Sequence, residues 1–150
     1  MKNIFDKEVS DDIIGRINKL QLNKKPLWGK MSASKMLAHC NVQYEMVYTD
    51  KHKKPNVFMK SMLKLLVKNT VVSEKPYKRN LKTAPQFLIV DNKNFEEEKV
   101  RLKKYIEKTQ ELGGDYFNGK ESHSFGKLTK QEWNNLFYKH LDHHLSQFEV

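Results

Sequence analysis

The sequence is poor in cysteine and in long apolar runs. Its single cysteine, Cys40, excludes an internal disulfide and a cysteine-rich zinc cage, and it is typical of a reducing compartment. A helix that spans a bilayer needs about 20 consecutive apolar residues, and no run in the chain approaches that length. The segment after Lys2 also lacks the apolar core of a signal peptide. We therefore expect a cytoplasmic protein with no membrane span.

Internal repeats, low-complexity segments and the composition of a disordered chain are absent as well. Of the 150 residues, 38% are hydrophobic and 31% are charged, which are ordinary values for a globular protein. A chain of this length can bury one fair-sized core. Residues 1–150 are therefore interpreted as a single domain.

Acidic residues are outnumbered, and the formal net charge is +10. Such an excess can attract nucleic acid, but the lysines are spread along the chain, from Lys24 and Lys25 to Lys103 and Lys104. Zinc-finger spacings and the aromatic signature of RNA-recognition domains are absent. Solvated surface charge is the favoured interpretation. Nucleic acid is disfavoured as a partner, and an anionic substrate or lipid stays open.

Apolar residues recur with the period of an α-helix in four long segments. Ser32 and Asn94 are suitable N-caps, Thr129 with Glu132 forms a capping-box pattern, and Gly113 follows the third segment. We expect an all-α four-helix bundle with a long crossover between the second and third long helices. The expected long helices cover about residues 6–22, 32–48, 94–112 and 129–148.

The crossover contains an extra, shorter helix, expected over residues 56–71, with one basic and one apolar face. Lys60, Lys64 and Lys68 share the basic face, and apolar residues such as Phe58 occupy the opposite one. Such a helix can lie on an anionic membrane surface, or it can cover the side of a bundle. We expect the second arrangement, because amphipathicity usually has that meaning in a globular domain.

The last helix carries the main candidates for a functional site. His140 and His144 are four residues apart and stack one turn above the other on the inward face. A His-x-x-x-His pair can bind one metal ion; the alternative is a pair of core histidines bonded to other groups. His39 borders the inward face of the second helix and can meet the pair if the two helices run antiparallel. We predict these three residues as metal ligands.

Weaker candidates lie around the predicted ligands. Gln43 and Gln147 are each one turn from a ligand and could orient it or a bound water molecule. His143 is the main rival for a ligand position, but its place at the edge of the inward face favours an outer role or exposure. Lys30 could reach the mouth of the site. Cys40 points away from the ligands and is interpreted as a buried apolar residue.

The expected loops contribute less specific candidates. The irregular connection over residues 72–93 could form a rim above the site, where Arg79 or Lys82 could bind an anionic group. His52 and His123 fall in expected loops and are interpreted as surface residues.

Several motifs together resemble a known family. Trp28-Gly29-Lys30-Met31 precedes the second expected helix and Phe125-Gly126 precedes the last, which carries His140-Leu141-Asp142-His143-His144-Leu145-Ser146-Gln147-Phe148. With His39, these marks resemble a branch of the DinB-like superfamily of bacterial metal-binding four-helix bundles, over about residues 6–149. The resemblance implies a divalent metal held at the positions of His39, His140 and His144. It also implies kinship with metal-dependent transferases that use low-molecular-weight thiols such as bacillithiol or mycothiol.

Three neutral imidazoles leave at least one coordination position for solvent or substrate, as in catalytic sites. Zinc or nickel fits nitrogen ligands best. The leading hypothesis is a metal-dependent thiol transferase acting on a small-molecule electrophile, with a metal-dependent hydrolase as runner-up. A helical binding or stress-response module without enzymatic activity is the alternative class. A homodimer stays open.

Overall fold

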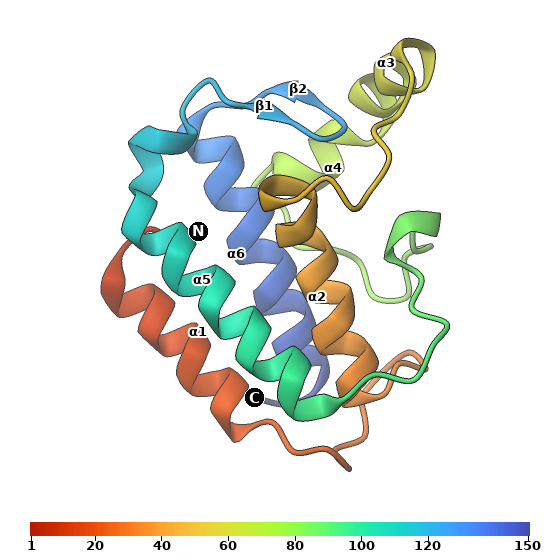
Figure 1. The fold of residues 1–150 in the computed structure, drawn as a ribbon, viewed down its shortest axis with the longest axis vertical. Helices are drawn as coiled ribbons and strands as arrows, with labels where there is room; N and C mark the ends of the chain where they lie inside the picture. Colours follow the sequence, from red (N-terminus) through yellow and green to blue (C-terminus); the bar gives the residue numbers. More distant parts are fainter.

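The computed structural model describes residues 1–150, and the chain is mostly helical (Figure 1). The mostly helical character predicted from the sequence is confirmed, whereas a small pair of strands was not predicted. The four longest helices are α1 (Lys7–Lys19), α2 (Ala33–Tyr48), α5 (Phe95–Phe117) and α6 (Lys130–Gln147). The connection between α2 and α5 holds the shorter α3 (Val57–Leu66) and α4 (Lys68–Val72) and a 3-10 turn, η1 (Pro85–Phe87). Between α5 and α6, strands β1 (Glu121–Ser122) and β2 (Gly126–Lys127) pair antiparallel.

The four longest helices lie side by side and share one core (Figure 1). α2 and α5 run in the same direction, because Asn41 contacts Glu98 near the start of α5 while Tyr48 contacts Thr109 further along it. α6 runs opposite to α2, because the end of α6 lies beside the segment that precedes α2. The long connection from α2 to α5 therefore returns the chain to the end of the molecule at which α2 begins.

Aromatic rings fill the centre between the helices. Phe137 of α6 stacks on Tyr44 of α2 and on Trp133, with ring centroids 5.1 and 5.4 Å apart. Phe117 of α5 meets Phe137 edge-on at 5.5 Å. All four rings are buried, and each aromatic side chain removes about 150–250 Å² from water. Because Phe137 and Tyr44 lie within two turns of His140 and His39 respectively, this packing fixes the spacing of α2 and α6 at the site.

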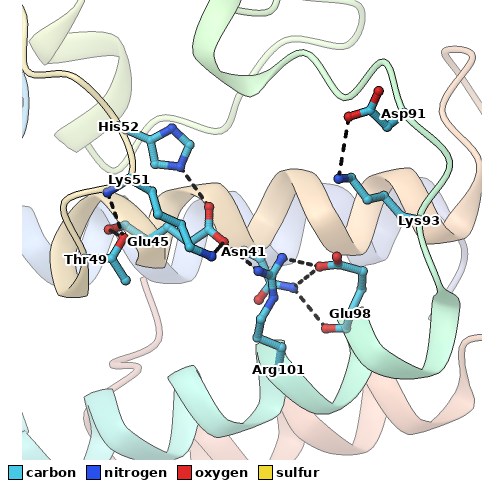
Figure 2. A network of polar contacts seen from close by, with 9 residues as sticks. All are labelled: Asn41, Glu45, Thr49, Lys51, His52, Asp91, Lys93, Glu98 and Arg101. Atoms are coloured by element: carbon cyan, nitrogen blue, oxygen red, sulfur yellow. Dashed lines mark hydrogen bonds and ion pairs between the residues drawn. The ribbon is translucent and has the colours of Figure 1, made fainter.

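Figure 2 shows a polar network that joins α2 to α5. Arg101 of α5 donates to Glu45 of α2 over 2.6 Å and also pairs with Glu98. Asn41 donates from Nδ2 to a carboxylate oxygen of Glu98 over 2.8 Å. Burial alone would raise the pKa of Glu45, but a hydrogen bond from His52 and the charge of Arg101 help to hold that pKa below its ordinary value. The network fixes the register of α2 on α5.

Local capping signals set several helix ends. The side chain of Ser32 accepts from the backbone at the start of α2, and that of Asn94 accepts from two backbone N–H groups at the start of α5. Thr129 and Glu132 form the capping box that begins α6. Gly113 has a φ of 71° and breaks α5, so the expected end of the third long helix is a kink followed by one further helical turn. The predicted N-caps are confirmed, whereas the predicted end near Leu112 is wrong, because α5 resumes after Gly113 and ends at Phe117.

The expectation for residues 56–71 is wrong in two respects. The helix is broken into α3 and α4, and α3 has no buried residue, so its apolar side does not cover the long helices. Lys60 pairs with Glu121 of β1, and Lys68 pairs with Glu132 of α6. Because these ion pairs hold Lys60 and Lys68 toward the rest of the protein, the apolar residues Phe58, Leu65 and Leu66 face outward. None of the helices combines the length and the apolar character needed to cross a membrane.

Candidate metal centre

Three histidines from two helices meet inside the protein. His39 of α2 and His140 and His144 of α6 offer ring nitrogen atoms that all lie within 4.8 Å of one another. The Nε2 atoms of His39 and His140 are 2.9 Å apart. The ring centroid of His144 lies 4.5 Å from that of His39 and 4.9 Å from that of His140. The structure thus brings together, in buried positions, the three residues selected from helix geometry.

The convergence follows from helix direction and spacing. His140 and His144 are one turn apart in the second half of α6, so their rings lie on one side of that helix. His39 lies in the first half of α2. Since α2 and α6 are antiparallel, these two halves face each other, and the three rings reach a common point.

The backbone of η1 holds the ring of His39. Its Nδ1 lies 2.9 Å from the carbonyl oxygen of Phe87. A carbonyl only accepts a hydrogen bond, so the proton of neutral His39 is on Nδ1, and Nε2 carries the free electron pair. The ring of Phe87 also packs against His39 and His140, with centroids 5.2 and 5.8 Å away. His39 therefore presents an unprotonated nitrogen to the other two imidazoles.

Gln147 orients His144 in the same way. The amide Nε2 of Gln147 donates to the backbone carbonyl of Trp28 over 2.6 Å, which leaves its Oε1 to accept from Nδ1–H of His144 over 2.9 Å. The Nε2 of His144 is then unprotonated as well. Gly29 permits this contact, since its φ is +78° and a Cβ would come within 2.8 Å of the Gln147 amide nitrogen. The segment before α2 thus sets the tautomer of a histidine in α6.

Burial keeps the three imidazoles neutral. It lowers the pKa of His140 well below the ordinary value, and the charges of His144 and His39 act in the same direction. Burial, followed by the charge of His39, lowers the pKa of His144 to about 3, and burial also lowers the pKa of His39. Neutral imidazole is the form that binds a metal ion. No carboxylate or thiol belongs to the cluster, so the donor set is three nitrogen atoms.

Part of the connection between α4 and α5 lies over the outer side of the cluster. Tyr77 packs edge-on against His143, with centroids 5.6 Å apart, and Trp28 contacts the same imidazole at 5.7 Å. The guanidinium carbon of Arg79 lies 4.3 Å from the centre of the Trp28 ring. Lys82 is exposed. The segment over residues 77–87 therefore borders the histidines with two aromatic rings, Tyr77 and Phe87, and one guanidinium group.

Residues 4–150 match the model of a family described as a protein of unknown function, DUF1569. The chain belongs to this family. The match includes every site residue described above, from Trp28 to Gln147. No curated protein and no solved structure matches the chain.

The weaker candidates in this DUF1569 protein have different surroundings. Gln147 is hydrogen-bonded to a histidine of the cluster, whereas Gln43 is half-buried and makes no hydrogen bond to it. Lys30 is exposed. Cys40 is buried with its Sγ 3.7 Å from the Sδ of Met36, and burial raises the pKa of its thiol. Cys40 is thus a core residue and lies outside the nitrogen cluster.

Sequence reasoning missed three features of the site in this DUF1569 protein. It did not identify the backbone carbonyl of Phe87 as the acceptor for His39 or the backbone carbonyl of Trp28 as the acceptor for Gln147. It also did not identify Tyr77 as a neighbour of His143. The short apolar run that begins at Phe87 was the only available signal. The expectation that His123 lies at the surface is wrong, because its ring is buried near the backbone of residue 52.

Proposed function

We propose that this DUF1569 protein binds one divalent metal ion through His39, His140 and His144, on a four-helix bundle of the DinB-like type. The observation that carries the proposal is the convergence of three buried, neutral imidazoles, two of which are hydrogen-bonded so that Nε2 is free. The directions of α2, α5 and α6 and the long connection from α2 to α5 support the bundle.

The donor set fits a late first-row metal ion. Zinc–imidazole bonds are about 2.0–2.1 Å long, so two nitrogen atoms on a tetrahedral ion lie about 3.3 Å apart. The 2.9 Å between His39 and His140 is close to that separation, and all three nitrogen atoms lie within 4.8 Å of one another. Nitrogen ligands without carboxylates favour zinc or nickel over magnesium or calcium.

The proposed reaction is transfer of a low-molecular-weight thiol to a small electrophile. Three imidazole ligands leave a coordination position for another molecule, and an ion held there would act as a Lewis acid that lowers the pKa of a thiol or of water. In the transfer, the thiol loses its proton to solvent and its sulfur forms a bond to the electrophilic carbon, while the bond from that carbon to the leaving group breaks and the leaving group departs with the electron pair. Metal-dependent hydrolysis is the second candidate. The lack of a carboxylate in the cluster disfavours it, because attack by water commonly uses a general base and attack by a thiolate does not.

Residues around the cluster would control access to it. The ring of Phe87 packs on His39 and His140 and excludes water from that side. Arg79, held against Trp28, places a positive charge at the border of the site. This charge would attract an anionic group on the thiol cosubstrate or on the electrophile.

Metal binding is tested by the metal content of purified variants. His140→Ala/His144→Ala removes two of the three ligands and should abolish stoichiometric binding of zinc or nickel, measured by equilibrium dialysis with elemental analysis. His143→Ala is the matched control, because His143 lies in the same helix with its ring against Trp28, and this variant should keep the ion. Metal retained by the double variant, or equal loss in both variants, would contradict the site.

Turnover is a separate test. Wild-type protein loaded with zinc or nickel should accelerate consumption of a low-molecular-weight thiol in the presence of an alkylating electrophile, and the double variant should not. Hydrolysis of an activated ester without thiol consumption would favour the second candidate. Stoichiometric metal without either reaction would favour a binding or stress-response module.

A further inference from the structure

Helix α3 presents its apolar side to solvent. None of its residues is buried, and Val57, Phe58, Leu65 and Leu66 are 85%, 76%, 81% and 68% exposed. The helix stands away from the four longest helices in Figure 1. Large apolar side chains gathered on one exposed helix are unusual in a protein that functions free in solution, and they indicate a surface that is covered in use.

The orientation of α3 is set by ion pairs with the body of the protein. Lys60 pairs with Glu121 of β1, and Lys68, just beyond the end of α3, pairs with Glu132 of α6. Lys60 lies on the side of α3 away from Phe58, Leu65 and Leu66. The ion pairs therefore hold Lys60 and Lys68 against the protein and leave Phe58, Leu65 and Leu66 facing outward.

Exposed lysines without an ion pair lie within α3 and directly before it. Residues 51–73 contain six lysines and no acidic residue, which supplies +6 of the net charge of +10. Lys53 and Lys54, directly before α3, are exposed, as is Lys64 within it, and none of the three has an ion pair. We call the exposed apolar residues of α3, together with these three lysines, the α3 surface.

The size of the α3 surface argues against a second copy of the chain as its occupant. A helix of 10 residues is about 15 Å long and 10–12 Å wide with its side chains, so it offers a footprint on the order of 150 Å². Each partner in a stable protein pair buries about 800 Å². A lipid surface has no such minimum area, and it accepts short apolar faces flanked by lysines.

We propose that the α3 surface docks this protein onto an anionic lipid bilayer. Phe58, Leu65 and Leu66 enter the boundary between headgroups and acyl chains, while Lys53 and Lys54 lie against headgroup phosphates. The docking is peripheral, and it is independent of metal binding at the histidine cluster. Because an amphipathic helix with lysines loses attraction when salt screens the charges, binding weakens at high ionic strength.

Sedimentation of the full-length chain with vesicles tests the proposal. The wild type should bind vesicles of phosphatidylcholine mixed with phosphatidylglycerol at least about tenfold more tightly than vesicles of phosphatidylcholine alone, and should be released in about 0.5 M salt. Phe58→Ser/Leu65→Ser/Leu66→Ser should reduce binding at least tenfold without changing the circular dichroism spectrum. Leu22→Ser/Val90→Ser, which alters exposed apolar residues elsewhere, is the matched control and should bind as the wild type does.

The lysines are tested in the same assay. Lys53→Ala/Lys54→Ala should reduce binding about fivefold per lysine, and Lys103→Ala/Lys104→Ala, an equal change in charge on α5, should have a smaller effect. Binding that is unchanged in the triple serine variant would overturn the role of the apolar side. No binding to anionic vesicles by the wild type, or self-association of the wild type that the triple variant loses, would overturn the proposal in favour of a protein partner.

Discussion

Acidification of the metal-free protein should destabilise it through the histidine cluster. The pKa of His144 is about 3 in the folded state and about 6.5 when the chain is unfolded. Between these values the unfolded chain binds a proton that the folded protein excludes, so the stability present above pH 6.5 is lost as the pH falls below it. At pH 5, which lies about 1.5 units below the pKa of the unfolded chain, His144 alone lowers the free energy of unfolding by about 2 kcal/mol, because each pH unit is worth about 1.36 kcal/mol. Burial shifts the pKa of His140 and His39 in the same direction, so their losses add to it.

Urea unfolding with a chelator present, at pH 7 and at pH 5, measures this loss. His144→Asn is the informative variant, because its amide Nδ2 takes the place of Nδ1 and keeps a donor for Gln147, while the group no longer titrates. The variant should lose about 2 kcal/mol less than the wild type between the two pH values. Equal losses in the two proteins would refute the view that His144 is buried and neutral in the metal-free state.

Two further predictions concern the residues that hold the site in place. Gly29→Ala should lower the free energy of unfolding by about 1–3 kcal/mol, because Gly29 has a positive φ and a Cβ would press on Gln147; Gly15→Ala, where a Cβ meets no atom within 4 Å, should not be destabilising. Lys139→Met should cost at least about 2 kcal/mol in urea unfolding, since the Lys139 ammonium donates to three backbone carbonyls in residues 70–75 that would lose their partner. Faster hydrogen exchange in α4 should accompany that loss, and unchanged exchange there would contradict the proposed role.

The helices were predictable because their signals are local. Ser32, Asn94 and the Thr129–Glu132 pair act on backbone groups within three residues, and Gly113 acts on its own φ. The division of the 56–71 segment and its orientation were not predictable in this way. An amphipathic period has the same form whether the apolar side faces a core or solvent. The orientation of this segment is instead set by ion pairs between residues more than 60 positions apart, which local sequence does not reveal.

The candidate site was predictable where its residues are related by the spacing within a helix. The four-residue spacing of His140 and His144 places both rings on one side of a helix, and the inward face of the second helix suggested His39. Phe87 and Tyr77 lie in a connection without a regular period, so neither could be assigned a partner. Gln147 was a candidate through its spacing, but its second hydrogen bond, to the backbone before α2, requires the chain to return from more than 100 residues away.

The sequence by itself determined where the long helices begin and break, and that two imidazoles of α6 share one side of it, because capping and helical spacing act over a few residues. Only the tertiary structure decided that a third imidazole meets them, which ring nitrogen of His39 and His144 is free, and that the apolar side of α3 faces solvent. Each of these depends on contacts between residues far apart in the chain, which form when antiparallel and parallel helices pack around one core.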